Sequence, residues 1–187
     1  MLCSALVRRI SVVGTAGSGK SMLARELAAI LDVPNLELDG VFHQPRWEKL
    51  PAEDFCRIVS AKAAGDAWVI DGNYSAVQAL IWARADTVVW LDLPKRTVMR
   101  QVIWRTLRRL ATRRELWNGN RESWSNLFSL DPDRSIIAWS WHKHAQYRAR
   151  YTAAAADPAS SHLRFVRLTS RRDVIRFLAL SAQKAQR

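Results

Sequence analysis

The feature that most constrains this chain is an eight-residue stretch near its start, which reads G-x-x-x-x-G-K-S from Gly14 to Ser21. Residues 8–13 before it are typical of a short strand, and residues 21–31 after it carry apolar side chains at helical spacing. Glycines between a strand and a helix let the backbone curl tightly, and the amides that open a helix attract anions. The pattern therefore predicts a loop that cradles phosphate groups.

The positions of this loop differ in their expected tasks. Lys20 is expected to reach the β- and γ-phosphates of a nucleotide, and the Ser21 hydroxyl to bind Mg²⁺. The other positions are expected to hold phosphate through their backbone amides: Gly14, Thr15, Ala16, Gly17, Ser18 and Gly19. ATP and Mg²⁺ are the expected cofactors. A Gly- and Ser-rich turn that happens to precede a helix is the alternative, and the flanking strand and helix argue against it.

Composition narrows the class of protein. The chain has 187 residues, of which 49% are apolar, and this suits one domain with a core over residues 1–187. No apolar run approaches the roughly 20 residues of a membrane helix, and Arg8 and Arg9 come too early for a signal peptide. Cys3 and Cys56 predict neither a disulfide framework nor a metal site. We therefore expect a cytoplasmic protein that does not bind membranes. Its oligomeric state stays open.

Positive charge is concentrated in one segment. The net charge is +12, and residues 95–150 hold eleven Arg and two Lys against four acids, which places +9 of the charge there. A segment of this kind indicates an anionic partner, such as nucleotide phosphates, nucleic acid or an acidic surface.

A long helix expected over residues 96–114 carries part of this charge. Arg105, Arg109 and Arg113 recur every fourth residue and form a basic stripe. A second stripe is apolar and consists of Met99, Ile103, Leu107 and Leu110. The Trp-, Asn- and Ser-rich segment that follows, about 113–131, is expected to be a lid. Arginine can follow a phosphoryl group during transfer, so Arg105 and Arg109 are the expected lid cations, although a solvated helix face is the alternative.

Strands and helices alternate along the rest of the chain. Further strands are expected at residues 35–39, 67–70, 87–91 and 163–168, and further helices at 51–64, 76–82, 134–156 and 171–182, with a loop over 41–50. This alternation predicts an α/β fold with a parallel sheet between two layers of helices. Ligands of such sheets bind at the carboxyl ends of the strands.

Three expected strand ends carry an aspartate. Asp71 follows an apolar strand and is expected to hold Mg²⁺, with a turn Asp as the alternative. Asp39 is equally consistent with a turn Asp and with a group that takes a proton from a substrate hydroxyl. Asp92 is expected to cap the helix that follows it.

The aromatic residues divide by context. Trp68 and Trp90 lie in apolar runs and are expected in the core. Trp47, Trp117 and Trp124 lie in irregular segments and are candidates for stacking or lid residues.

Together these motifs resemble the P-loop kinases of the adenylate-kinase-like superfamily, and most of all the bacterial topology-modulation and adenylate-kinase-like P-loop proteins. The stretches that carry the resemblance cover essentially the whole chain: residues 14–21, the strand end at 36–39, Trp68-Val69-Ile70-Asp71-Gly72-Asn73-Tyr74, the strand end at 90–94, and 116–123. The resemblance implies a three-layer αβα fold with a five-stranded parallel sheet and an Arg-bearing lid. It also implies that Ser170 and Arg171 border the adenine of ATP.

One departure from the family pattern concerns the phosphoryl acceptor. Adenylate kinases place an Arg that binds the monophosphate shortly after the Asp-Gly, and residues 73–75 are Asn-Tyr-Ser. We therefore expect a small-molecule acceptor that offers a hydroxyl and is not AMP. The residues expected to face it are Asp39, His43, Trp47, Asn73 and Tyr74.

The expected function is accordingly an ATP- and Mg²⁺-dependent kinase. The alternative from another class is a nucleic-acid-associated P-loop ATPase or regulator that uses the basic segment 95–150. A steep dependence of DNA or RNA binding on salt would favour that alternative.

Overall fold

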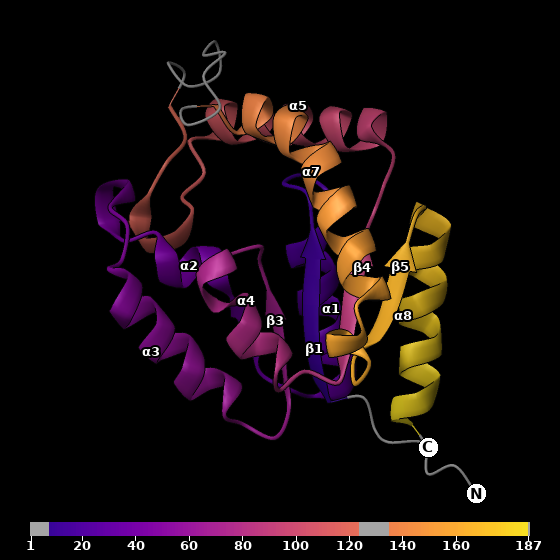
Figure 1. Ribbon diagram of the computed structural model, residues 1–187. Coiled ribbons are helices and arrows are strands. Elements are labelled where there is room, and N and C mark those ends of the chain that lie inside the picture. Colours follow the sequence, from indigo (N-terminus) through magenta and orange to yellow (C-terminus); the bar gives the residue numbers. More distant parts are fainter. Residues whose placement is uncertain (1–7, 124–134, 187) are drawn as a thin grey trace, which may run out of the picture.

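The structure is a computed structural model that describes residues 8–123 and 135–186. Five strands form one sheet at its centre (Figure 1). They are β1 (Arg9–Gly14), β2 (Asn35–Glu37), β3 (Trp68–Asp71), β4 (Thr87–Leu91) and β5 (Arg164–Leu168), in the order β2-β3-β1-β4-β5. Every pairing is parallel, so all the carboxyl ends meet at one edge of the sheet.

Alternate side chains of the strands enter two separate cores. Ile10 and Val12 of β1 pack with α1 (Lys20–Leu31) and α8 (Arg171–Ala185). Val13 points to the opposite face, which is covered by α3 (Ala52–Ala63), α4 (Ser75–Trp82) and α7 (Ile136–Ala156). A parallel sheet buried on both faces explains the nearly continuous apolar runs of its strands. The predicted three-layer αβα fold with five parallel strands is confirmed.

The element bounds agree closely with the prediction for most of the chain. The first, third, fourth and fifth strands lie within a residue of their predicted ranges, and the long helix, α5, spans Lys95–Thr112. Trp68 and Trp90 are buried in the core, as predicted.

The second strand is shorter than predicted. It ends at Glu37, and a short helix α2 (Leu38–Phe42) follows, so Asp39 lies in a helix and not at a strand end. Residues 41–50 are likewise not a simple loop, because they contain the end of α2 and a 3₁₀ turn at Pro45–Trp47. The cause is a tertiary contact between Leu38 and Gly72. Leu38 is buried, and a Cβ added to Gly72 would lie 2.8 Å from the Leu38 Cβ.

The inward face of α5 also differs from the prediction. Its buried residues are Val98, Val102, Thr106 and Leu110, so the predicted apolar stripe is wrong for Ile103 and Leu107, which are exposed. The buried row is rotated because Val98 and Val102 pack against Gly17 of the phosphate loop. Arg105 and Arg109 flank this row and are half-buried.

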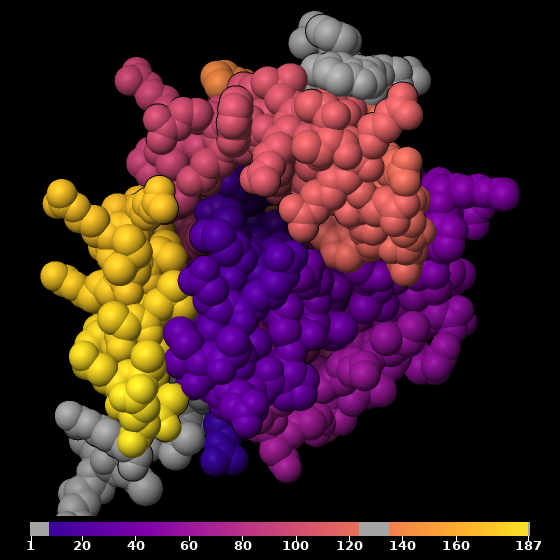
Figure 2. All heavy atoms as spheres, turned by 180° about the vertical axis from the view of Figure 1, so that it is seen from behind, coloured from indigo at the N-terminus to yellow at the C-terminus, as the bar shows by residue number. Residues whose placement is uncertain are grey.

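Two helices lie across the carboxyl end of the sheet, where ligands of such folds bind (Figure 1). They are α5 and the first turns of α7. From behind, α5 and the residues up to 123 overhang the surface formed by α1 (Figure 2). Residues 124–131 of the predicted lid, including Trp124, lie outside the described residues. Within the described part of the chain, no helix is long and apolar enough to cross a membrane.

Candidate nucleotide and acceptor site

The predicted phosphate loop joins β1 to α1 and depends on glycine. Gly14, Gly17 and Gly19 have φ angles of 152°, 85° and 94°, which residues with a Cβ rarely adopt. At Gly17 an added Cβ would also lie 2.7 Å from the Val102 Cβ of α5. Lys20 opens α1 at the end of the helix where free amides gather, and this end favours bound anions.

Ser21 and Asp71 meet beside this loop. The Ser21 hydroxyl donates a hydrogen bond of 2.7 Å to Asp71 Oδ2, and Asp71 Oδ1 is buried with no partner within the described residues. Burial raises the pKa of Asp71 to about 6, although the charge of Lys20 acts against the rise. Hydroxyl and carboxylate oxygens are donors that Mg²⁺ prefers, so the free Oδ1 and its neighbour fit that cation. Within residues 8–123 and 135–186, no group of three or more His, Cys, Asp and Glu side chains is placed to hold a metal ion.

Asn73 contacts the phosphate loop directly. Its Nδ2 donates to the Gly14 carbonyl at 2.6 Å, and the Gly14 N–H donates to its Oδ1 at 3.2 Å. The Tyr151 hydroxyl of α7 donates to the same Oδ1 at 2.9 Å. The structure thus places the Asn73 amide against the first glycine of the loop, and its predicted contact with an acceptor stays a prediction.

Three of the other predicted acceptor residues lie together. The Tyr74 hydroxyl donates to Asp39 Oδ1 at 2.7 Å and lies 3.5 Å from His43 Nε2. Burial and the nearby Asp39 carboxylate raise the pKa of Tyr74, which keeps it a hydrogen-bond donor. Burial lowers the pKa of His43, and Lys49 adds to the effect while Asp39 opposes it. The group therefore combines a carboxylate, a neutral imidazole and a phenol.

Trp47 and Trp117 join this group to the residues after α5. The Trp47 N–H donates to Asn120 Oδ1 at 2.8 Å, and its indole donates to the Arg121 carbonyl at 3.1 Å. The indole of Trp117 donates to Glu37 Oε2 at 3.0 Å.

Close packing accompanies these bonds. Gly40 lies against the Trp117 ring, since an added Cβ would be 2.8 Å from its Cδ1. Asn118 Nδ2 donates to the carbonyls of Gly40 and His43, at 3.1 and 2.5 Å. Neither Asn118 nor Asn120 has a role predicted from the sequence. A weak signal for both was their position in a Trp-Asn-Gly-Asn run that carried the family resemblance.

The predicted lid arginines have different environments. Arg109 forms an ion pair of 2.9 Å with Glu122, and both side chains are mostly buried. Arg105 has no ion pair within the described residues, and its Nε is buried without a hydrogen-bond partner. Burial lowers the pKa of Arg105 to about 10, and the neighbouring charge of Arg109 contributes. Arg105 is thus a cation held in a poorly solvated position near the site.

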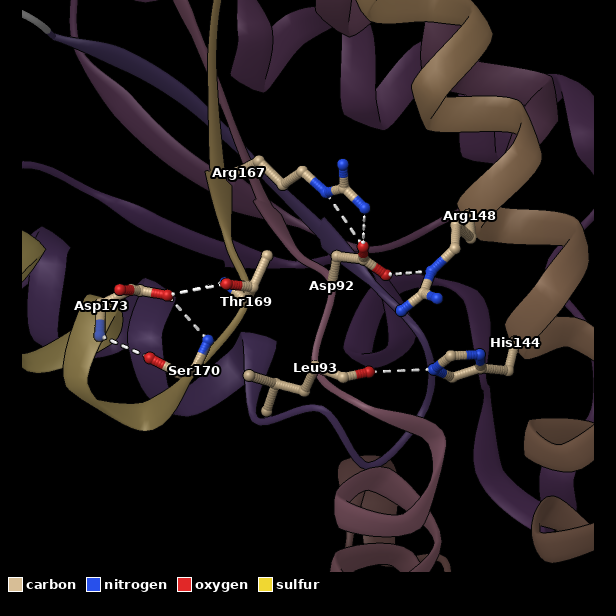
Figure 3. Close-up of polar contacts among 8 residues, drawn as sticks. All are labelled: Asp92, Leu93, His144, Arg148, Arg167, Thr169, Ser170 and Asp173. Carbon is tan, nitrogen blue, oxygen red and sulfur yellow. Dashed lines mark hydrogen bonds and ion pairs between the residues drawn. The ribbon is translucent and has the colours of Figure 1, made fainter.

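Asp92 does not cap α5, whose first residue is preceded by Pro94, so that prediction is wrong. Its carboxylate is 4% exposed and lies between two guanidinium groups (Figure 3). Arg148 of α7 donates to Oδ1 at 2.8 Å, and Arg167 of β5 donates to Oδ2 through Nε at 2.9 Å and through a second nitrogen. A buried carboxylate requires such partners, and here it joins two strands and a helix.

Ser170 and Arg171, predicted to border the adenine, lie at the start of α8. The Ser170 hydroxyl accepts a hydrogen bond from the Asp173 N–H, and Asp173 accepts in turn from the Ser170 N–H (Figure 3). This reciprocal capping box fixes the loop after β5. Arg171 is exposed.

The comparisons with known proteins support the fold. No protein-family model matches the sequence, and no curated protein matches it. Solved structures do resemble it. The shikimate kinase of Bacteroides thetaiotaomicron is 14% identical with a TM-score of 0.53, and 96% of each chain is covered. The shikimate kinase of Acinetobacter baumannii in complex with shikimate is 16% identical with a TM-score of 0.54, covering 95% of this chain and 94% of that one.

A third similar structure is a gluconokinase from Sinorhizobium meliloti 1021, 15% identical with a TM-score of 0.51 and 97% of each chain covered. At such low identity these likenesses establish the architecture. The order of the five strands, the phosphate loop after β1 and these neighbours agree with the resemblance drawn from the sequence: the chain has the fold of the adenylate-kinase-like P-loop kinases.

Proposed function

We propose that this protein is an ATP- and Mg²⁺-dependent kinase that transfers a phosphoryl group to a hydroxyl of a small molecule in the cytoplasm. The observation that carries the proposal is the contact of Ser21 with Asp71 beside the glycine loop, with one buried Asp71 oxygen free for a cation. The names of the similar solved structures, shikimate kinase and gluconokinase, support the same reaction class.

On the nucleotide side, the chain acts by position and charge. Lys20 and the loop amides would hold the β- and γ-phosphates, while Ser21 and Asp71 would hold Mg²⁺ directly or through water. The cation supplies charge neutralisation at the phosphate oxygens when bound. Arg105, which has no ion pair within the described residues, has a guanidinium available for the transferring group.

On the acceptor side, Asp39 is the proposed base. Tyr74 donates to its Oδ1, and this bond fixes the carboxylate while Oδ2 makes no hydrogen bond to the described residues. Oδ2 is therefore the oxygen that would accept the proton of the acceptor hydroxyl. His43, whose lowered pKa favours the neutral imidazole, lies 3.5 Å from the Tyr74 hydroxyl and would add a hydrogen-bonding group beside the acceptor.

The acceptor can be found by a screen. Nucleosides, nucleoside monophosphates and small hydroxy compounds would be tested for stimulation of ADP release from Mg·ATP. We expect a hydroxy compound to stimulate it. Robust phosphorylation of AMP would contradict the acceptor assignment, and stimulation by no compound would contradict the kinase proposal.

The role of Asp39 is tested on the acceptor so found. Asp39→Asn keeps the shape and removes the charge, and we expect the rate of acceptor phosphorylation to fall by about 10²-fold while affinity for ATP is nearly unchanged. The matched control is Asp54→Asn in α3, whose ion pair with Arg57 is exposed. Full activity of Asp39→Asn would show that Asp39 is not the base.

A second candidate function rests on the outer face of α5. This helix contains no acidic residue, and Trp104 is 70% exposed on the same face as Arg100 and Arg108. An exposed indole among arginines fits the stacking and phosphate contacts of a nucleic-acid-binding surface. This function is tested by measuring the affinity for DNA or RNA as a function of salt concentration, which should fall steeply as salt is added. Trp104→Ala should weaken the binding.

A further inference from the structure

Helix α7 presents a row of polar side chains to the loops at the carboxyl end of the sheet. Ser140, His144 and Arg148 recur every fourth residue, and Tyr151 continues the row. Ser140 is 0% exposed and Tyr151 1%. Burial of polar groups on a helix face costs free energy unless each has a partner, so the partners of this row are informative.

Two members of the row act on the phosphate loop. The Ser140 hydroxyl donates a hydrogen bond of 2.8 Å to the carbonyl of Ala16. The Tyr151 hydroxyl donates to Asn73, which itself binds both the N–H and the carbonyl of Gly14. Two carbonyls of the loop, at its first and third positions, are thus held by side chains from outside it.

The other two members fix α7 itself. His144 Nε2 lies 3.0 Å from the Leu93 carbonyl, and Arg148 donates to Asp92 (Figure 3). Both partners lie in the short connection between β4 and α5. These contacts fix the position of α7 at the edge of the sheet without involving the phosphate loop. The helix can therefore hold the loop in a defined position.

Peptide geometry links the held carbonyls to phosphate binding. In a planar trans peptide, the carbonyl of one residue and the N–H of the next point in opposite directions. A Gly14 carbonyl bound to Asn73 therefore turns the Thr15 N–H away from Asn73. An Ala16 carbonyl bound to Ser140 turns the Gly17 N–H away from α7. Neither amide donates a hydrogen bond to the described residues, so both remain available to an anion at the loop.

We propose that α7 fixes the conformation of the phosphate loop for nucleotide binding. Ser140 and Tyr151 are the positioning residues: Ser140 acts directly on the loop, and Tyr151 acts through Asn73. This inference rests on the proposed function for the identity of the ligand. Without the Ser140 hydroxyl, the Ala16 carbonyl loses its partner and its peptide can rotate. Without the Tyr151 hydroxyl, Asn73 loses the bond that fixes its amide against Gly14, and the Gly14 peptide is held less firmly. A smaller fraction of molecules then holds the amides in the phosphate-binding arrangement.

The test measures nucleotide binding without turnover. A non-hydrolysable ATP analogue with Mg²⁺ is titrated calorimetrically into the unmodified protein, Ser140→Ala and Tyr151→Phe. Each substitution should raise the Kd about three- to tenfold, the equivalent of one hydrogen bond. The matched control is Ser181→Ala, whose hydroxyl donates to the Phe177 carbonyl within α8 at 2.8 Å, and it should leave the Kd unchanged.

A double-mutant cycle separates the relay from independent structural effects. Because Tyr151 acts through Asn73, adding Tyr151→Phe to Asn73→Ala should change the Kd no further. Additive losses would overturn the relay. Variants with lower melting temperatures but unaltered Kd would overturn the positioning role, and this comparison holds for Ser140→Ala and Tyr151→Phe even where Asn73→Ala does not fold. Failure of the unmodified protein to bind the analogue would reject the proposed function itself.

Discussion

Among the predicted acceptor residues, burial and neighbouring charges shift the pKa values of single side chains. Tyr74 has a raised pKa because it is buried beside Asp39, so it donates to that carboxylate. His43 has a lowered pKa because it is buried, with Lys49 nearby. Both pKa shifts favour the uncharged forms of Tyr74 and His43 beside Asp39, an arrangement suited to the proposed role of Asp39 as a base.

The lowered pKa of His43 has a consequence for stability. Unfolded histidine takes up a proton as the pH falls below about 6.5, whereas folded His43 does so only at lower pH. Neutral His43 therefore contributes fully to the stability of the folded state above about pH 6.5. This contribution is lost as the pH falls from there through the lower pKa of folded His43. Between pH 7.5 and 5.5, the free energy of unfolding in urea should fall more for the unmodified protein than for His43→Gln. His142→Gln, at an exposed position, is the control, and an identical pH dependence for His43→Gln would refute the argument.

At the scale of elements, α5 links the phosphate loop to the lid segment. Its buried row packs on Gly17, and its half-buried flank carries Arg105 and Arg109. The ion pair of Arg109 with Glu122 joins the helix to residues beyond it. Trp47 and Asn120 then join those residues to the acceptor side. One continuous set of contacts therefore connects the glycine-rich loop after β1, the residues after α5, and the group formed by Asp39, His43 and Tyr74.

This arrangement makes Arg105 the lid cation to test. In Arg105→Ala, kcat should fall by about 10²-fold with only a small change in ATP affinity, because the charge that the guanidinium meets grows in the transition state. Arg108→Ala, on the exposed face of the same helix, is the matched control and should keep its kcat. A rise in Kd as large as the fall in kcat would show that Arg105 serves ground-state binding instead.

Closure of the lid segment is measured separately. Hydrogen exchange over residues 113–131 should slow when a non-hydrolysable ATP analogue and Mg²⁺ are added. Unchanged exchange at saturating analogue would argue against a lid.

For the whole molecule, periodicity and motif spacing were enough to predict the sheet, the glycine-rich turn between β1 and α1 and most element bounds. They worked because the central strands β1, β3 and β4 are buried on both faces, and because Gly14, Gly17 and Gly19 have positive φ angles that favour glycine. Periodicity and motif spacing failed where contacts with residues distant in the sequence determine the local structure. Leu38 turns into α2 because it packs on Gly72, and Asp92 binds Arg148 and Arg167 from elements far along the chain.

Contacts between residues far apart in the sequence also limited the prediction of the candidate site. No local pattern could show that Asn73 holds Gly14 or that Tyr151 of α7 completes this contact, because these residues are 59 and 78 positions from their partners. The contact of Ser21 with Asp71 could be anticipated because Asp71 ends β3, and the glycine-rich loop that leads to Ser21 follows β1, the strand paired with β3.

The central claim is that the glycine loop holds a nucleotide for phosphoryl transfer, and Lys20→Ala tests it most directly. The measurement is the rate of ADP formation from Mg·ATP, with the acceptor from the screen, in the unmodified protein, Lys20→Ala and the exposed control Lys62→Ala. The account predicts a loss of about 10²-fold or more in Lys20→Ala at unchanged melting temperature, and no loss in Lys62→Ala. A well-folded Lys20→Ala that forms ADP at nearly the unmodified rate would contradict it.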